Sequence, residues 1–322
     1  MPSDPFSLAA GANGVLYIGD PGRHQILKRL PGGRFEVAVG TGVAGTSGDG
    51  GPAARAEIDI PQSLLATPAG ALYIFDGRDT PSTPSGFTAE VREVAPDGTI
   101  TTLVGACTGI DASHDAVARA ALGTPSGAIG PNGNLYLLGS TCGERASGPL
   151  LELTSAGRLV DDAPFDAALT KASCLPPSGI AFSGNAALYA ACDSGGGHGK
   201  ELLIVQPNGS AKAFPHVYPY DDEGGLATAP DGTVIAGDYY SVVRVTPQGV
   251  RTIINFTPGA SGSRALGPNG SMEPNGIAID RDGNIYLAAT SGFGDGTFTG
   301  IIELHTSGRV QVLWSRPSTR AG

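Results

Sequence analysis

The chain aligns with itself six times, and this repetition limits the fold more than any other feature of the sequence. The copies begin near residues 5, 61, 125, 177, 224 and 274. Each copy reads as a short apolar strand, a turn containing Gly or Asn, and a second apolar strand. The second strands recur at intervals of roughly 46–63 residues, which is the range expected for the blades of a propeller.

Two further strands follow in every copy. The third is apolar, as in Leu202 to Val205, and a turn ending in a glycine such as Gly98 or Gly209 joins it to a more polar fourth strand. Glycine suits these turns because it adopts positive φ without steric strain. No helix-length pattern separates the strands. The sequence therefore predicts an all-β, six-bladed propeller with four antiparallel strands per blade.

We expect one domain over residues 1–322, with blades at approximately 5–42, 61–106, 125–165, 177–217, 224–257 and 274–315. Each blade is then made of contiguous sequence. The ring is accordingly expected to close by packing of blade 6 against blade 1.

Two motifs carry a resemblance to a known family. PNGIAID (274–280), followed by GNIY (283–286), resembles the NHL repeat. GTGVAGTSGDGGPAARAEIDIP (40–61) is similar to the linker of bacterial NHL propellers, and residues 105–125 are a degenerate second copy of it. The resemblance implies a six-bladed NHL-repeat propeller of the bacterial extracytoplasmic sensor-domain type.

The charge of the chain argues against two classes of partner. Its formal net charge is −10, whereas nucleic acids and anionic lipid surfaces attract a basic surface. No apolar run approaches the roughly 20 residues that a membrane-spanning helix needs. We therefore expect no nucleic-acid partner and no direct insertion into a membrane.

Four cysteines allow three disulfide pairings, and the propeller fold favours one of them. In a four-stranded blade, the loop that leads into the blade (the lead-in loop) and the loop between strands two and three lie on the same face, which we call the mouth face. This placement predicts disulfides Cys107–Cys142 and Cys174–Cys192. The alternative is four buried free thiols. Disulfides favour an extracytoplasmic location, secreted or at the cell surface, with the signal or anchor missing from this chain.

The mouth face also collects aromatic and arginine side chains, the residue types that recognition surfaces use. The alternative is that several of the aromatic rings fold inward and fill the funnel. The candidate ligand-binding residues are Arg23, Arg78, Arg145, Tyr239, Tyr240, Phe293 and Phe298.

Three histidines should project from the same face: His114, His198 and His216. Neutral imidazoles around a central mouth could hold Zn²⁺ and leave an open coordination position. Some propellers similar to this one, the peptide-amidating lyases, use three histidines in this way. His24 and the aspartates that end second strands, such as Asp76, are interpreted as structural residues.

The leading hypothesis is a non-catalytic, extracytoplasmic sensor or recognition propeller without a cofactor. It would bind a peptide, glycan or small-molecule ligand, or another protein, with the loops of the mouth face. The alternative is a metal-dependent lyase or hydrolase with zinc at the central mouth. In that hypothesis His114, His198 and His216 are the metal ligands or the acid–base groups.

Overall fold

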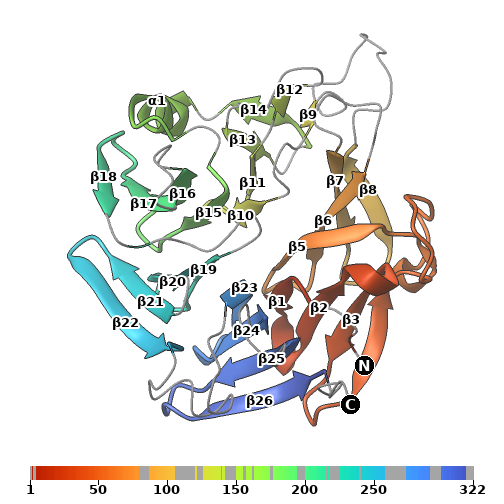
Figure 1. The fold of residues 1–322 in the computed structure, drawn as a ribbon. Helices are drawn as coiled ribbons and strands as arrows, with labels where there is room; N and C mark the ends of the chain where they lie inside the picture. Colours follow the sequence, from red (N-terminus) through yellow and green to blue (C-terminus); the bar gives the residue numbers. More distant parts are fainter. Residues whose placement is uncertain are drawn as a thin grey trace.

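In the computed structural model of the chain, residues 2, 5–79, 87–105, 120–121, 126–138, 140–141, 150–154, 157–161, 163–174, 177–193, 200–214, 217, 225–238, 241–257, 273–290 and 299–316 are described. They form six four-stranded antiparallel sheets arranged in a ring (Figure 1). The predicted fold class, a six-bladed propeller made almost entirely of strands, is confirmed.

Each blade is built from strands in chain order, from the centre of the ring to its outside. Blades 1 and 2 consist of β1 (Leu8–Ala10), β2 (Leu16–Asp20), β3 (Gln25–Arg29) and β4 (Phe35–Val39), and of β5 (Ile60–Ala66), β6 (Leu72–Asp79), β7 (Phe87–Val94) and β8 (Ile100–Val104). Blades 3 and 4 consist of β10 (Gly127–Ile129), β11 (Leu135–Leu138), β13 (Leu150–Leu153) and β14 (Leu159–Asp161), and of β15 (Gly179–Phe182), β16 (Leu188–Asp193), β17 (Lys200–Val205) and β18 (Ala211–Phe214).

Blades 5 and 6 complete the ring. They consist of β19 (Leu226–Thr228), β20 (Val234–Asp238), β21 (Ser241–Thr246) and β22 (Gly249–Asn255), and of β23 (Glu273–Ile279), β24 (Ile285–Thr290), β25 (Thr299–Leu304) and β26 (Val310–Ser315). A separate two-stranded ribbon pairs β9 (Ala120–Ala121) with β12 (Ser140–Thr141). Short 3₁₀ turns are η1 (Ala12–Gly14), η2 (Pro21–Arg23) and η3 (Ala53–Arg55).

The glycine-containing turns that the sequence predicts connect the strands of these sheets. Gly98, between β7 and β8, has a φ of 86°, and the Asp97 carboxylate beside it accepts a hydrogen bond from the Thr99 N–H at 2.9 Å. An L-residue with a Cβ rarely adopts this conformation, which explains why glycine ends the turn.

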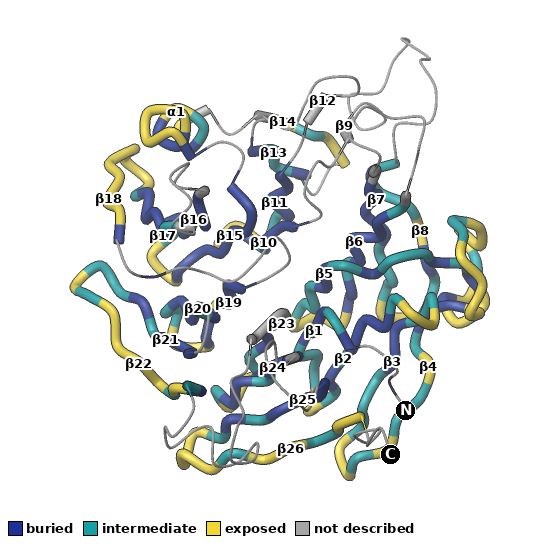
Figure 2. The backbone as a smooth tube through the Cα atoms, in the orientation of Figure 1, coloured by how far each residue is buried: buried dark blue, intermediate teal, exposed yellow. Residues whose placement is uncertain are grey.

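The hydrophobic core lies between blades. Period-two alternation gives each strand an apolar row on both faces, and each row packs on the neighbouring blade. Ile26 and Val39 of blade 1, for example, share a buried cluster with Leu72 and Ile74 of blade 2. Figure 2 shows the inner strands mostly buried and the outer strands more exposed.

The ring closes by packing of blade 6 against blade 1, as expected. Leu8 and Ile18 of blade 1 share one buried cluster with Ala278 and Ile301 of blade 6. Among the described residues no strand is exchanged across this border, since β1 to β4 and β23 to β26 form two separate sheets. The closure therefore depends on side-chain packing rather than on a shared strand.

One α-helix was not expected. α1 (Ala163–Lys171) lies in the lead-in loop of blade 4, and its Phe165 and Leu169 are buried in the cluster that blades 3 and 4 share. These two residues stand four positions apart and so lie on one face of the helix. Asp166 accepts a hydrogen bond from the Leu150 N–H at 2.7 Å, which attaches the helix to blade 3.

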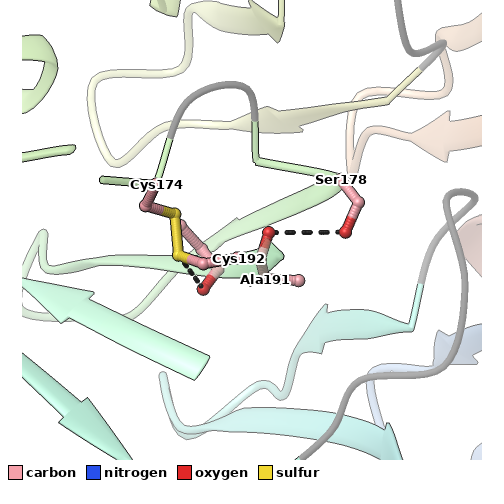
Figure 3. The surroundings of a disulfide bond; sticks show 5 residues. Cys174, Ser178, Ala191 and Cys192 are labelled. Atoms are coloured by element: carbon pink, nitrogen blue, oxygen red, sulfur yellow. Dashed lines mark hydrogen bonds between the residues drawn. A yellow bond between two sulfur atoms is a disulfide. The ribbon is translucent and has the colours of Figure 1, made fainter. Parts of the chain in front are cut away.

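The predicted disulfide Cys174–Cys192 is confirmed (Figure 3). Its Cα atoms are 4.9 Å apart, within the usual range, and both residues are buried. Cys192 lies within β16 rather than in the following loop, so the bond ties the lead-in loop of blade 4 to a strand. Cys107 and Cys142 lie outside the described residues.

The linker between blades 1 and 2, residues 40–59, forms a strap that Arg92 helps to attach to blade 2. The Arg92 side chain is fully buried and donates to the Glu57 carbonyl at 2.7 Å, the Ser47 carbonyl at 3.2 Å and the Asp49 carboxylate at 2.6 Å. The other Asp49 oxygen accepts from the Thr102 N–H at 2.9 Å. The strap is thereby fixed to blade 2 from both its third and its fourth strand.

Candidate functional site

The six innermost strands surround a central cavity of about 220 Å³. The described residues that line it are Ser, Gly, Ala, Leu, Ile and Thr, so none of them carries a charge. Ser7 and Ser126 come directly before β1 and β10, at the end that opens on the mouth face, Ser63 lies within β5, and Gly179 and Gly276 also line the cavity. The Ser7 hydroxyl donates to the Pro61 carbonyl at 2.7 Å, which joins blades 1 and 2 at the mouth.

Charged side chains gather beside this mouth, at the border of blades 1 and 2. We call the group formed by Arg23, His24, Asp59 and Arg78 the rim site. Arg23 ends the turn η2, His24 follows it with a left-handed φ of 52°, and Arg78 lies near the end of β6. Asp59 stands just before β5, in the lead-in loop of blade 2.

Asp59 is the centre of the rim site. Its carbonyl lies 2.8 Å from His24 Nδ1 and its carboxylate 3.4 Å from the same nitrogen. A carbonyl oxygen can only accept a hydrogen bond, so Nδ1 carries the proton and a neutral His24 presents its lone pair at Nε2. The Asp59 carboxylate also lies 3.9 Å from Arg78 Nε. One residue thus orients both an imidazole and a guanidinium.

The nitrogen-bearing side chains of the rim site are more exposed than its carboxylate. The exposed fraction is 47% for the Arg23 side chain, 35% for His24 and 29% for Arg78, but 19% for Asp59. Asp20, which lies 3.7 Å from Arg23 Nε, is completely buried. The surface presented to a ligand is therefore formed mainly by nitrogen donors.

Two buried carboxyls lie below the rim site. Asp76 and Glu90 stand opposite each other on β6 and β7. Both Asp76 oxygens accept the Asp59 N–H, at 3.0 and 3.1 Å. Burial raises the pKa of Asp76 to about 7 against the effect of this hydrogen bond, and burial likewise raises the pKa of Glu90 to about 7 against the charges of Arg92 and Arg78.

The structure describes the positions of two of the predicted ligand-binding residues. It brings Arg23 and Arg78 to the same border, although they are far apart in the sequence. The other predicted binding residues, Arg145, Tyr239, Tyr240, Phe293 and Phe298, lie outside the described residues. So do the three histidines of the metal hypothesis, His114, His198 and His216.

Sequence reasoning interpreted His24 and Asp76 as structural residues, and it did not single out Asp59 and Glu90. Glu90 carries a usable signal, because strand alternation places it on the same face of β7 as the buried Arg92. Asp59 carries no comparable signal, since its role depends on where two blades meet.

Within the described part of the chain, no group of three or more His, Cys, Asp or Glu side chains is placed to hold a metal ion. No helix among these residues is long and apolar enough to cross a membrane.

The fold and its repeats define a six-bladed β-propeller, and an NHL-type propeller fits both. A family model described as "Beta-propeller repeat" matches residues 261–296. No curated protein matches the sequence.

Several solved structures share this fold at low sequence identity. One is described as glucose dehydrogenase, with a TM-score of 0.53, 15% identity, and 95% of this chain and 97% of that chain covered. Another is a catalytically inactive virginiamycin B lyase from Staphylococcus aureus with quinupristin, with a TM-score of 0.51, 13% identity and 96% and 83% covered. A protein of unknown function from Bacteroides thetaiotaomicron has a TM-score of 0.52 and 10% identity, with 89% and 69% covered. At these identities the likeness concerns the fold alone.

Proposed function

We propose that the chain is an extracytoplasmic recognition propeller that captures its ligand on the mouth face, beside the central cavity. The observation that carries the proposal is the convergence of Arg23 and Arg78. Both were predicted to bind ligand, and both reach the surface at the border of blades 1 and 2. Guanidinium groups supply several directed donors, which suits them to recognition of polar ligand groups.

The rim site is also pre-organised, which lowers the entropy lost on binding. Asp20 lies beside Arg23, and Asp59 lies beside both His24 and Arg78. The strap holds Asp59 in place, because Arg92 binds the carbonyl of Glu57 two residues earlier. A ligand would therefore meet side chains whose positions are already constrained.

The proposed location outside the cytoplasm is supported by the buried disulfide Cys174–Cys192, since such bonds persist in oxidising compartments. The class of ligand, which can be a peptide, a glycan, a small molecule or another protein, is left open by this proposal.

A screen of thermal stability tests the proposal. Short peptides, acidic oligosaccharides and small organic acids would be added to the purified protein and the change in Tm measured. A ligand that raises Tm should lose its effect in Arg23→Gln and Arg78→Gln. Arg34→Gln is the matched control, because Arg34 is an exposed arginine at the opposite end of blade 1.

A second pair of substitutions tests whether the ligand also reaches the central mouth. The double variant Tyr239→Ala and Phe293→Ala should abolish binding if the predicted aromatic residues contribute. Binding that survives both the arginine and the aromatic substitutions would place the site elsewhere on the propeller.

The alternative function, a metal-dependent lyase or hydrolase, stays a prediction. The similarity to virginiamycin B lyase concerns the fold and assigns no residue. Elemental analysis of the purified protein tests it: one equivalent of zinc that is lost in His198→Ala would favour this function over the recognition function.

A further inference from the structure

The buried pair Asp76–Glu90 is not explained by the fold. The exposed fraction is 2% for Asp76 and 6% for Glu90. Glu90 Oε1 accepts no hydrogen bond among the described residues, and Arg92 Nε, 3.9 Å away, donates none there. An ionised carboxylate without a full set of donors is costly to bury, so this pair favours the protonated form.

Charged groups face this pair from every element around it. β6 contributes Arg78, β7 contributes Arg92, the lead-in loop contributes Asp59, and blade 1 contributes His24. The strap adds Asp49 and Glu57, and Asp20 and Arg23 lie at the outer side of the rim site.

Carboxyls outnumber guanidinium groups in this set. When Asp76 and Glu90 are both ionised, the local charge is negative and opposes the approach of an anion. When both are protonated, two negative charges are removed, one of them from Glu90, on which the charge of Arg78 acts. The field is weakly screened here because the pair is buried, so the change reaches the surface.

Building on the recognition function proposed above, we propose that the rim site binds an oxyanion, such as a carboxylate, sulfate or phosphate group, and that loss of protons from Asp76 and Glu90 weakens this binding. Arg23 and Arg78 would supply the guanidinium donors, and His24 would add its Nε2–H when the ring is protonated. Asp76 and Glu90 do not touch the ligand but set the charge beneath it.

The pH range follows from the two carboxyls. Burial raises the pKa of each to about 7, so both hold their protons in mildly acidic solution and lose them in mildly alkaline solution. Affinity for an oxyanion should therefore be greatest below neutral pH and should fall as the pH passes through about 7.

Sulfate is a suitable probe because its charge is constant across this range. Titration calorimetry at constant ionic strength should show sulfate bound about tenfold more weakly at about pH 8 than at about pH 5.5. Glu90→Gln keeps the shape and removes one of the two charges, so this variant should lose clearly less affinity than the wild type between the two pH values. Glu93→Gln is the matched control: it removes the same charge from the opposite face of β7 and should behave as wild type.

A second measurement detects the protonation of Asp76 and Glu90 in the absence of a ligand. The infrared band of protonated carboxyl groups, recorded without sulfate, should disappear as the pH rises through neutrality and should be weaker in Glu90→Gln. If sulfate binding needs Arg78 but is the same at both pH values, the proton linkage is wrong and the recognition function stands. If sulfate does not bind at either pH, the oxyanion site is wrong, whatever the infrared band shows.

Discussion

Replacing Asp49 with alanine should destabilise the protein by about 2–4 kcal/mol, because it leaves a buried guanidinium without its carboxylate. Arg92 is fully buried, and among the described residues Asp49 is the carboxylate that accepts a hydrogen bond from it, at 2.6 Å. The substitution also removes the acceptor of the Thr102 N–H. The full cost of breaking a buried ion pair is not expected, since the Asp49 side chain is 43% exposed and two carbonyl groups still bind Arg92.

The chain contains a closely matched control. Asp231 lies 2.6 Å from Arg244 and accepts a hydrogen bond from the Thr233 N–H at 3.0 Å, which repeats the geometry around Asp49. The difference is burial, since the Arg244 side chain is 37% exposed. Asp231→Ala should therefore cost no more than about 1 kcal/mol, as expected for a surface pair.

Equilibrium urea unfolding of both variants, followed by circular dichroism, measures the two costs side by side. The reasoning predicts that Asp49→Ala lowers the midpoint clearly more than Asp231→Ala, with unchanged slopes. Equal shifts in the two variants would refute it, because they would show that burial of the arginine does not determine the cost.

Three further predictions concern the disulfide, the ring closure and pH. Cys174→Ala together with Cys192→Ala should lower the free energy of unfolding by about 2–4 kcal/mol, and dithiothreitol should then lower Tm by less than it does in the wild type. Gly276→Ala should destabilise the border of blades 6 and 1, because its Cβ would lie 2.5 Å from the Phe6 carbonyl, whereas Gly249→Ala, with open space around it, should be nearly neutral in the same Tm measurement. Because the folded-state pKa of Glu90, about 7, is higher than its unfolded value, stability should fall as the pH rises from about 4.5 to about 7, and Glu90→Gln should reduce this fall in urea titrations at several pH values.

The six-bladed fold could be predicted from the sequence because each blade repeats the same pattern of apolar strands and glycine-containing turns. Apolar alternation identifies the strands, and glycines such as Gly98 identify the turns. The pairing of Cys174 with Cys192 followed from the propeller, since both positions belong to one face of one blade. Helix α1 was not predicted because its apolar pattern is short, with Phe165 and Leu169 only one turn apart. The helix is buried against blades 3 and 4, and the sequence does not reveal that contact.

The candidate site was only partly predictable. Arg23 and Arg78 were assigned to the mouth face because their positions within the repeat place them in its loops. The meeting of Arg78 with His24, the neighbour of Arg23, through Asp59 was not predictable, since it depends on the angle and distance at which blades 1 and 2 pack. The raised pKa of Glu90 depends on burial between those blades, which composition does not reveal.

The sequence by itself determined the number of blades, the order of their strands and the face that carries the loops. These properties depend on periodicity and on turn residues, which act over a few neighbouring positions. Only the tertiary structure decided which side chains from different blades come together, as His24, Asp59 and Arg78 do at the rim site. Contacts of this kind depend on how whole sheets pack, and a difference of a few ångströms between blades would separate them.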